Sequence, residues 1–157
     1  MHGMSSLSDD SIQYEDQRRV VGDVRDPKIW DSVLDGIDII FHQAAAVGMG
    51  QNMYEIAKYV EANSMATARM LEYLARHEHD VGELVVASSM SIYGEGNYKC
   101  EQCGPTQPGL RSKKNLAKSL WDPKCPDCGA ELHTLPTNEE KALNPAFIYA
   151  TAKRDQE

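Results

Sequence analysis

The sequence predicts an α/β protein in which helices cover both faces of a parallel sheet and a small cysteine-bound module interrupts the chain. Three observations lead to this class. Short apolar segments alternate with segments of helical periodicity between residues 19 and 91. The alternation stops over 99–133, where two Cys-x-x-Cys pairs occur. Helical periodicity then resumes up to residue 157, so we expect one interrupted domain.

The elements before the interruption follow one another as strand, helix, strand, helix, strand. Residues 19–21 supply the first expected strand. Asp26 followed by Pro27 predicts an N-cap and a first helical position, so a short helix should run from there to about Leu34.

Two buried strands and a long helix complete this part of the chain. The runs 37–41 and 84–87 are short and rich in β-branched residues, as buried strands are. Between them, apolar residues recur at helical spacing over 53–76, which predicts one long helix or two in succession. Nearly continuous apolar strands are typical of parallel sheets. A doubly wound parallel sheet is therefore expected.

The inserted segment, residues 99–133, divides this domain into 1–98 and 134–157. Its cysteines form two pairs, each followed by glycine, and are Cys100, Cys103, Cys125 and Cys128. Such knuckles present two thiolates from one tight turn, and two knuckles complete a tetrahedral site. Four sulfur ligands leave no open position, so we predict a structural metal, zinc by default or iron in a rubredoxin-like site. Two disulfides or four free thiols are the competing interpretation.

Length and charge restrict the partners of the protein. A chain of 157 residues is long enough for one domain with its own core. The formal net charge of -8 argues against nucleic acid as a partner, and we expect a solvated face for the inserted basic residues Arg111, Lys113, Lys114 and Lys118. No apolar run approaches the roughly 20 residues that span a bilayer, and residues 1–10 lack a signal peptide's basic and apolar regions. We expect a cytoplasmic protein without membrane contact.

Tyr149 and Lys153 are spaced to act together. They lie four residues apart in the helix expected from Phe147 to the end of the chain, so both project from one helix face. Phenols titrate near pH 10, but a neighbouring cation stabilises the phenolate and makes a tyrosine a usable acid/base. Amphipathic helices also carry this spacing by chance, so the pair requires further context.

That context is the expected strand at 84–87, which leads directly into Ser88, Ser89 and Ser91. Ligands of open α/β sheets bind beyond the carboxyl ends of the strands, where these hydroxyl groups would lie. The competing interpretation is that the serines cap a strand end or a turn.

Together these motifs resemble those of the extended short-chain dehydrogenase/reductase family, in particular its NAD-dependent nucleotide-sugar epimerases and dehydratases, which implies a partial Rossmann-like fold. Residues 149–153 resemble the catalytic Tyr-x-x-x-Lys of the family, and 85–94 its strand and serine segment. Residues 22–25 resemble its segment beside the adenine, 42–45 its strand-end motif, and Asn63 an asparagine of the following helix. With its cysteine insertion, the chain is most similar to a subgroup that includes dTDP-L-rhamnose 4-epimerase-like proteins.

The resemblance implies a role for each site residue. Tyr149 is implied to be the acid/base, Lys153 to assist it, and Ser89 to hold the substrate hydroxyl, with Ser88 and Ser91 as the competing serines. The residues implied to contact NAD, with NADP left open, are Asp23, Val24, Gln43, Ala44, Ala45, Val47, Asn63, Tyr149 and Lys153. A nucleotide sugar is the implied substrate, and a homodimer the implied assembly.

The sequence departs from the family in two places. Dehydratases of the family carry an Asp-Glu pair after the catalytic hydroxyl, where this chain has Met90 and Ser91, so an epimerase or a reductase is favoured. The glycine-rich loop that binds the pyrophosphate and the family's C-terminal region are not found. We therefore expect an incomplete, inactive chain that binds NAD poorly. A non-catalytic module that displays a zinc ribbon is the alternative.

Overall fold

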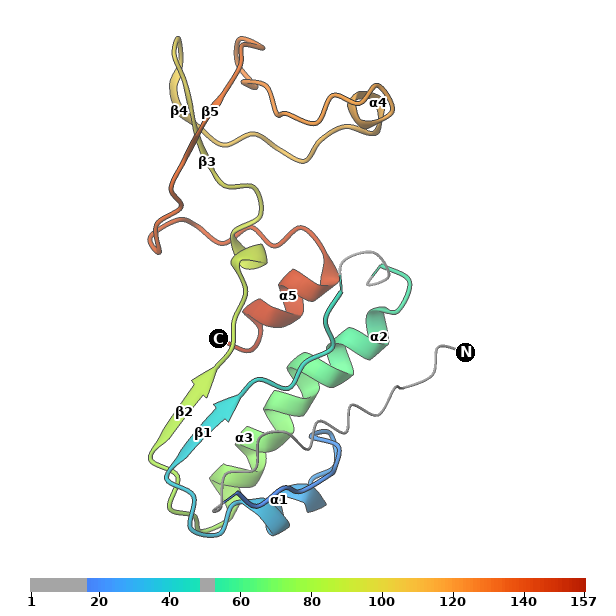
Figure 1. The fold of residues 1–157 in the computed structure, drawn as a ribbon, viewed down its shortest axis with the longest axis vertical. Coiled ribbons are helices and arrows are strands. Elements are labelled where there is room, and N and C mark those ends of the chain that lie inside the picture. Colours follow the sequence, from blue (N-terminus) through green and yellow to red (C-terminus); the bar gives the residue numbers. More distant parts are fainter. Residues whose placement is uncertain (1–16, 49–52) are drawn as a thin grey trace.

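The computed structural model describes residues 17–48 and 53–157, which form an elongated molecule with a small sheet at each end (Figure 1). The first ten residues, on which the expected lack of a signal peptide depends, lie outside this part of the chain. Over the described ranges, no helix is both long enough and apolar enough to cross a bilayer.

The first sheet consists of two parallel strands, as predicted. β1 (Ile39–His42) pairs with β2 (Glu83–Val86), with Ile39 opposite Glu83 and His42 opposite Val86. Alternate residues of each strand point to opposite faces, and Ile40 and Leu84 lie on the face that packs against the core.

Four helical segments lie on that core-facing side of the sheet (Figure 1). They are α1 (Lys28–Val33), α2 (Ile56–Tyr59), the π-helix η1 (Val60–Met65) and α3 (Ala66–Arg76), the last three forming one continuous helical run. Trp30, Leu34 and Met70 form the buried centre, around which the partly buried apolar residues pack. The predicted long helix is confirmed, with a π-helical turn in its middle.

The structure corrects two of the expectations about this sheet. Within the described ranges, residues 19–21 are not a strand, because no neighbouring strand pairs with them. Among the residues that the structure describes, helices pack against one face of the sheet only. On the other face Ile39, Phe41 and Val85 remain exposed, with 66% of Phe41 accessible. The apolar runs therefore predicted the strands correctly but not what covers them.

The short helix begins one residue later than expected. Pro27 is its N-cap rather than its first residue, and α1 starts at Lys28. The Asp26 carboxylate still accepts a hydrogen bond from the Lys28 amide at 3.0 Å, so the predicted side chain satisfies this helix end.

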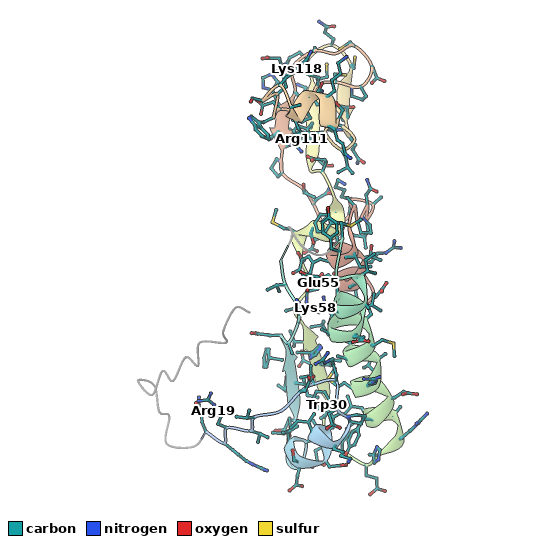
Figure 2. All side chains as sticks on the ribbon, turned by 90° about the vertical axis from the view of Figure 1, so that its right-hand side faces the viewer. Arg19, Trp30, Glu55, Lys58, Arg111 and Lys118 are labelled. Carbon is teal, nitrogen blue, oxygen red and sulfur yellow. The ribbon has the colours of Figure 1, made fainter. Side chains whose placement is uncertain are left out.

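The inserted module is an antiparallel ribbon at the opposite end of the molecule. It contains β3 (Asn97–Cys100), β4 (Gly104–Thr106), the short helix α4 (Lys113–Leu116) and β5 (His133–Leu135), with strand order β4-β3-β5. Its strands extend two residues beyond the expected bounds of 99–133 at each end. Figure 2 shows Trp30 in the core beside the first sheet, far from Arg111 and Lys118 on the ribbon.

The ribbon joins the rest of the molecule between η2 (Met90–Tyr93) and α5 (Ile148–Arg154). The chain leaves η2 through Gly94 and returns past Asn144, whose amide donates to the Ile92 carbonyl at 2.8 Å. Gly94 has φ +66°, and a Cβ there would lie 2.4 Å from the Asn144 carbonyl oxygen. Only glycine allows the two chain segments to approach so closely.

Candidate functional site

The predicted serine segment forms a capped turn at the end of β2. Ser89 is the N-cap of η2, and its Oγ accepts hydrogen bonds from the Ser91 amide at 3.2 Å and the Ser91 hydroxyl at 2.9 Å. The capping role that competed with the catalytic one is therefore present. Since both contacts use lone pairs of the Ser89 oxygen, its own O–H group remains able to donate to a ligand. Ser88 is exposed, and Ser91 is turned toward Ser89.

The Tyr-x-x-x-Lys segment lies in α5, which packs against η2 and against the π-helix η1. The Tyr149 ring packs edge-on against Tyr59, with ring centroids 6.3 Å apart. Lys153 is buried, and its ammonium group donates to the main-chain oxygen of Ala87, directly after β2. Burial lowers the pKa of Lys153 from its ordinary value. The helix of Tyr149 is thus joined to the strand that leads into the serines.

A shallow hollow brings together four of the residues implied to contact the cofactor. It is bordered by Asp23 and Val24 on one side and by Ala44 and Ala45, beyond the carboxyl end of β1, on the other. The guanidinium of Arg25 donates to the Asp23 carboxylate and lowers its pKa to about 2. The carboxylate of Asp23 is therefore paired with Arg25, and its carbonyl oxygen accepts from the Asp26 amide at 2.9 Å.

The other implied cofactor residues differ in exposure. Gln43 and Val47 are exposed near the same strand end. Asn63 is fully buried in the π-helix, where its Oδ1 accepts from the Ala46 amide at 2.7 Å and its Nδ2 donates to the Ala46 carbonyl at 3.2 Å. Its side-chain amide therefore holds the loop that borders the hollow. Single π-helical turns are frequent at functional sites.

Two polar residues that no sequence pattern singled out lie behind Lys153. Gln156 and Thr67 are buried, and a chain of hydrogen bonds joins Lys153 through them to His42, the last residue of β1. His42 is buried as well. No sequence motif joins these residues, since they come from three separate elements.

The structure places the four cysteines in one cluster. Their sulfur atoms all lie within 4.8 Å of one another, and Cys100 Sγ and Cys128 Sγ are 3.5 Å apart. Tetrahedral zinc with bonds of about 2.3 Å requires sulfur–sulfur distances of roughly 3.8 Å, so the cluster has the dimensions of such a site. Cys100 and Cys125 are buried and the other two exposed.

The backbone beside Cys100 favours its thiolate, whereas the hydrogen bond with the Cys128 side chain raises the pKa of Cys103 to about 12. The amides of Cys103 and Gln102 point at the Cys100 sulfur and lower its pKa to about 7. Each knuckle ends in a glycine of positive φ, +81° at Gly104 and +73° at Gly129, which allows the chain to turn sharply under the sulfurs. The donor set fits a metal that prefers four thiolates.

One basic residue of the ribbon serves an internal purpose. Arg111 forms an ion pair with Glu95 and donates to the main-chain oxygen of Trp121. Lys113, Lys114 and Lys118 are exposed, in keeping with the expected solvated face.

Comparison with known proteins identifies relatives of the chain. Its sequence is 29% identical over 147 residues to dTDP-L-rhamnose 4-epimerase from Burkholderia thailandensis, an alignment that covers 92% of this chain and 39% of that protein. The chain therefore spans well under half of this relative's length.

Two solved structures share its fold. The UDP-glucose 4-epimerase from Bifidobacterium longum, in complex with NAD+ and UDP, superposes with a TM-score of 0.58 at 21% identity, covering 88% of this chain and 31% of that one. A dTDP-glucose 4,6-dehydratase from Streptomyces venezuelae, with NAD and TYD bound, gives a TM-score of 0.55 at 21% identity, covering 86% and 30%. Both likenesses confirm the partial Rossmann-like α/β fold.

The family assignment depends on a match over most of the chain. A model of the NAD dependent epimerase/dehydratase family matches residues 1–118, which include β1, the π-helix with Asn63, β2 and the serine turn. The chain belongs to the NAD dependent epimerase/dehydratase family.

Proposed function

We propose that the protein carrying this chain is an NAD-dependent nucleotide-sugar 4-epimerase. The observation that carries the proposal is the hydrogen bond from Lys153 to the Ala87 carbonyl, which joins the Tyr-x-x-x-Lys helix to the strand end two residues before Ser89. The relatives named above support the substrate class, since they are epimerases and a dehydratase of nucleotide sugars.

Each of the three side chains has a defined task in this proposal. Tyr149 takes the proton of the sugar C4 hydroxyl and later returns it, and the Lys153 ammonium stabilises the phenolate between these steps. Ser89 donates its free O–H group to the C4 oxygen. NAD would supply the hydride acceptor at C4, held over the hollow between Asp23 and Ala45. Rotation of the keto sugar within the site before C4 is reduced again would invert the centre.

Epimerisation is favoured over elimination by the residues after Ser89. Elimination of water needs an acid and a base beside the catalytic hydroxyl, whereas Met90 and Ser91 supply neither a carboxylate nor another strong base. The alternative functions are a dehydratase or reductase of the same family, or a non-catalytic module that displays the ribbon.

The test is an NMR assay of the complete gene product with NAD and dTDP- or UDP-hexoses. We expect the C4 epimer to form, and Tyr149→Phe to slow its formation by about 100-fold or more. Tyr54→Phe is the matched control, because Tyr54 is 91% exposed. A 4-keto-6-deoxy product would indicate a dehydratase instead. Failure to bind NAD or to turn over any of these sugars would refute the proposal in favour of the non-catalytic module.

We further propose that the four cysteines hold one structural zinc ion. The mutual distances of the sulfurs and the amides directed at Cys100 support it. Zinc would hold the ribbon together, since few of the described ribbon residues are buried apart from Cys100 and Cys125. The cytoplasm, the compartment we propose, keeps thiols reduced and available to a metal.

Self-association as a homodimer completes the proposal. Exposed apolar side chains on the long helical run, including Ile56, Met65 and Leu71, support it. Sedimentation of the complete gene product at micromolar concentration should give twice the monomer mass, and a monomer under these conditions would contradict the dimer.

A further inference from the structure

The buried Lys153 ammonium group has two hydrogen-bond acceptors within the protein. One of its N–H groups donates to the Ala87 oxygen, and another donates to Gln156 Oε1 at 2.9 Å. Within the described part of the chain this leaves the third N–H group for a ligand or for Tyr149. The direction of the ammonium is therefore set by two acceptors from different segments.

Chemistry fixes the orientation of the Gln156 amide. An ammonium group only donates, so the amide oxygen must face Lys153 and the amide nitrogen must face away. That nitrogen donates to Thr67 Oγ1 at 2.7 Å. The amide of Gln156 is thus held at both of its ends.

The chain of hydrogen bonds continues to the end of β1. Thr67 Oγ1 lies 3.0 Å from His42 Nε2, and because the hydroxyl oxygen accepts from Gln156, its hydrogen is available to that nitrogen. In the neutral imidazole that carries its proton on Nδ1, Nε2 accepts from this hydroxyl. Burial, and after it the charge of Lys153, lower the pKa of His42 and so favour this form.

All four side chains are removed from solvent. The exposed fractions are 4% for His42, 3% for Thr67, 3% for Lys153 and 6% for Gln156. A buried ammonium without acceptors would be costly, and a buried chain of satisfied hydrogen bonds fixes its members rigidly. This series of hydrogen bonds joins the ends of β1, α3 and α5 behind the proposed site.

We propose that Gln156 is a positioning residue that holds the Lys153 ammonium beside Tyr149, and that Thr67 and His42 fix the Gln156 amide for this purpose. The inference depends on the proposed function of the Tyr149 and Lys153 pair. It assigns a role in the reaction to a residue that does not touch the substrate.

The primary test measures the pKa of Lys153 directly, by NMR titration of the protein with 13Cε-labelled lysine, without substrate or NAD. The Lys153 resonance is the one missing from Lys153→Met. Gln156→Leu removes an acceptor that stabilises the charged form, so the Lys153 pKa should fall further, by about one pH unit. Gln156→Glu supplies a stronger acceptor in the same place, so the pKa should rise.

The second test measures turnover in the complete gene product. Gln156→Leu should lower kcat about tenfold with little change in the KM for the sugar, because the residue acts only through Lys153. Thr67→Val should have a smaller effect of the same kind. Thr151→Val is the matched control, since Thr151 is exposed on the same helix and donates only to the Phe147 carbonyl.

Opposite pKa shifts in the two Gln156 variants, together with a fall in kcat, would support the proposal. An unchanged Lys153 pKa in both variants would overturn it, and so would shifted pKa values with an unchanged kcat. If the unaltered protein has no turnover, the proposed function fails instead, while the titration still decides whether Gln156 controls the ammonium group. Circular dichroism of each variant shows whether it is folded.

Discussion

The ammonium group of Lys141 donates a hydrogen bond to the main-chain oxygen of Tyr93 at 2.7 Å. Lys141 lies in the segment that returns from the ribbon, and it is 7% exposed. Tyr93 is the last residue of η2, the turn that Ser89 caps. This contact therefore fastens the base of the inserted module to the turn that carries the proposed catalytic serine.

Removing this contact should destabilise the protein. In Lys141→Met the carbonyl of Tyr93 loses its charged donor, and we expect the free energy of unfolding to fall by about 1 kcal/mol. Urea titration followed by circular dichroism measures the change. Lys118→Met is the matched control, since Lys118 is exposed on the ribbon, and equal stability of the two variants would contradict the role of the contact.

Gly94 should tolerate no side chain. Gly94→Ala adds a Cβ that would lie 2.4 Å from the Asn144 carbonyl oxygen, a backbone atom that cannot move aside freely. Gly36→Ala is the control at another glycine of positive φ, +70°, where nothing lies within 4 Å of the added carbon. Both variants place alanine at a positive φ, which is strained, and only Gly94→Ala carries the collision. Thermal unfolding should show a clearly larger loss at Gly94, and equal losses would contradict the close approach.

The cysteine cluster should contain one metal ion per chain. Plasma mass spectrometry of protein purified without added metal should find about one zinc, or iron in its place, and Cys100→Ser should lose it. Asp127→Asn is the control, because it changes the second knuckle while keeping all four thiols. Absence of any stoichiometric metal would refute the proposed site. Chelation should increase hydrogen exchange over 97–135 and leave β1 and β2 protected.

His42 should make stability depend on pH. Its pKa in the folded protein lies below the ordinary value of 6.5, so the unfolded chain binds the proton more tightly. The stabilisation is therefore complete above pH 6.5 and is lost as the pH falls from there through the folded pKa. The Asp23 carboxylate affects stability at a lower pH, because its pKa is lowered from 3.8 to about 2 in the folded protein.

Urea titrations at pH 8 and pH 5 measure this dependence. His42→Gln keeps a hydrogen-bond acceptor but does not titrate, so its stability should fall less between the two pH values than that of the unaltered protein. His77→Gln, which alters an exposed histidine, should retain the full dependence. If His42→Gln loses as much stability as the unaltered protein does, the buried imidazole is not the cause.

Local sequence patterns determined much of this protein. Cys-x-x-Cys spacing predicted a cluster because a tight turn brings both sulfurs of a knuckle together whatever surrounds it. The spacing of Tyr149 and Lys153 predicted one helix face, and the apolar runs predicted β1 and β2 within two residues. These are properties of neighbouring residues, so the sequence contains them directly.

The tertiary structure alone decided the rest. Residues 19–21 have the composition of a strand, yet a strand exists only where another one pairs with it, and none does so within the described residues. The exposure of Phe41 depends on which face of the sheet the helices cover. His42, Thr67 and Gln156 come from three separate parts of the fold, and no spacing along the sequence predicts that they are in contact. Their contact follows from the packing of α5 beside η1 and η2, because hydrogen bonds between distant residues form only once the fold has brought them together.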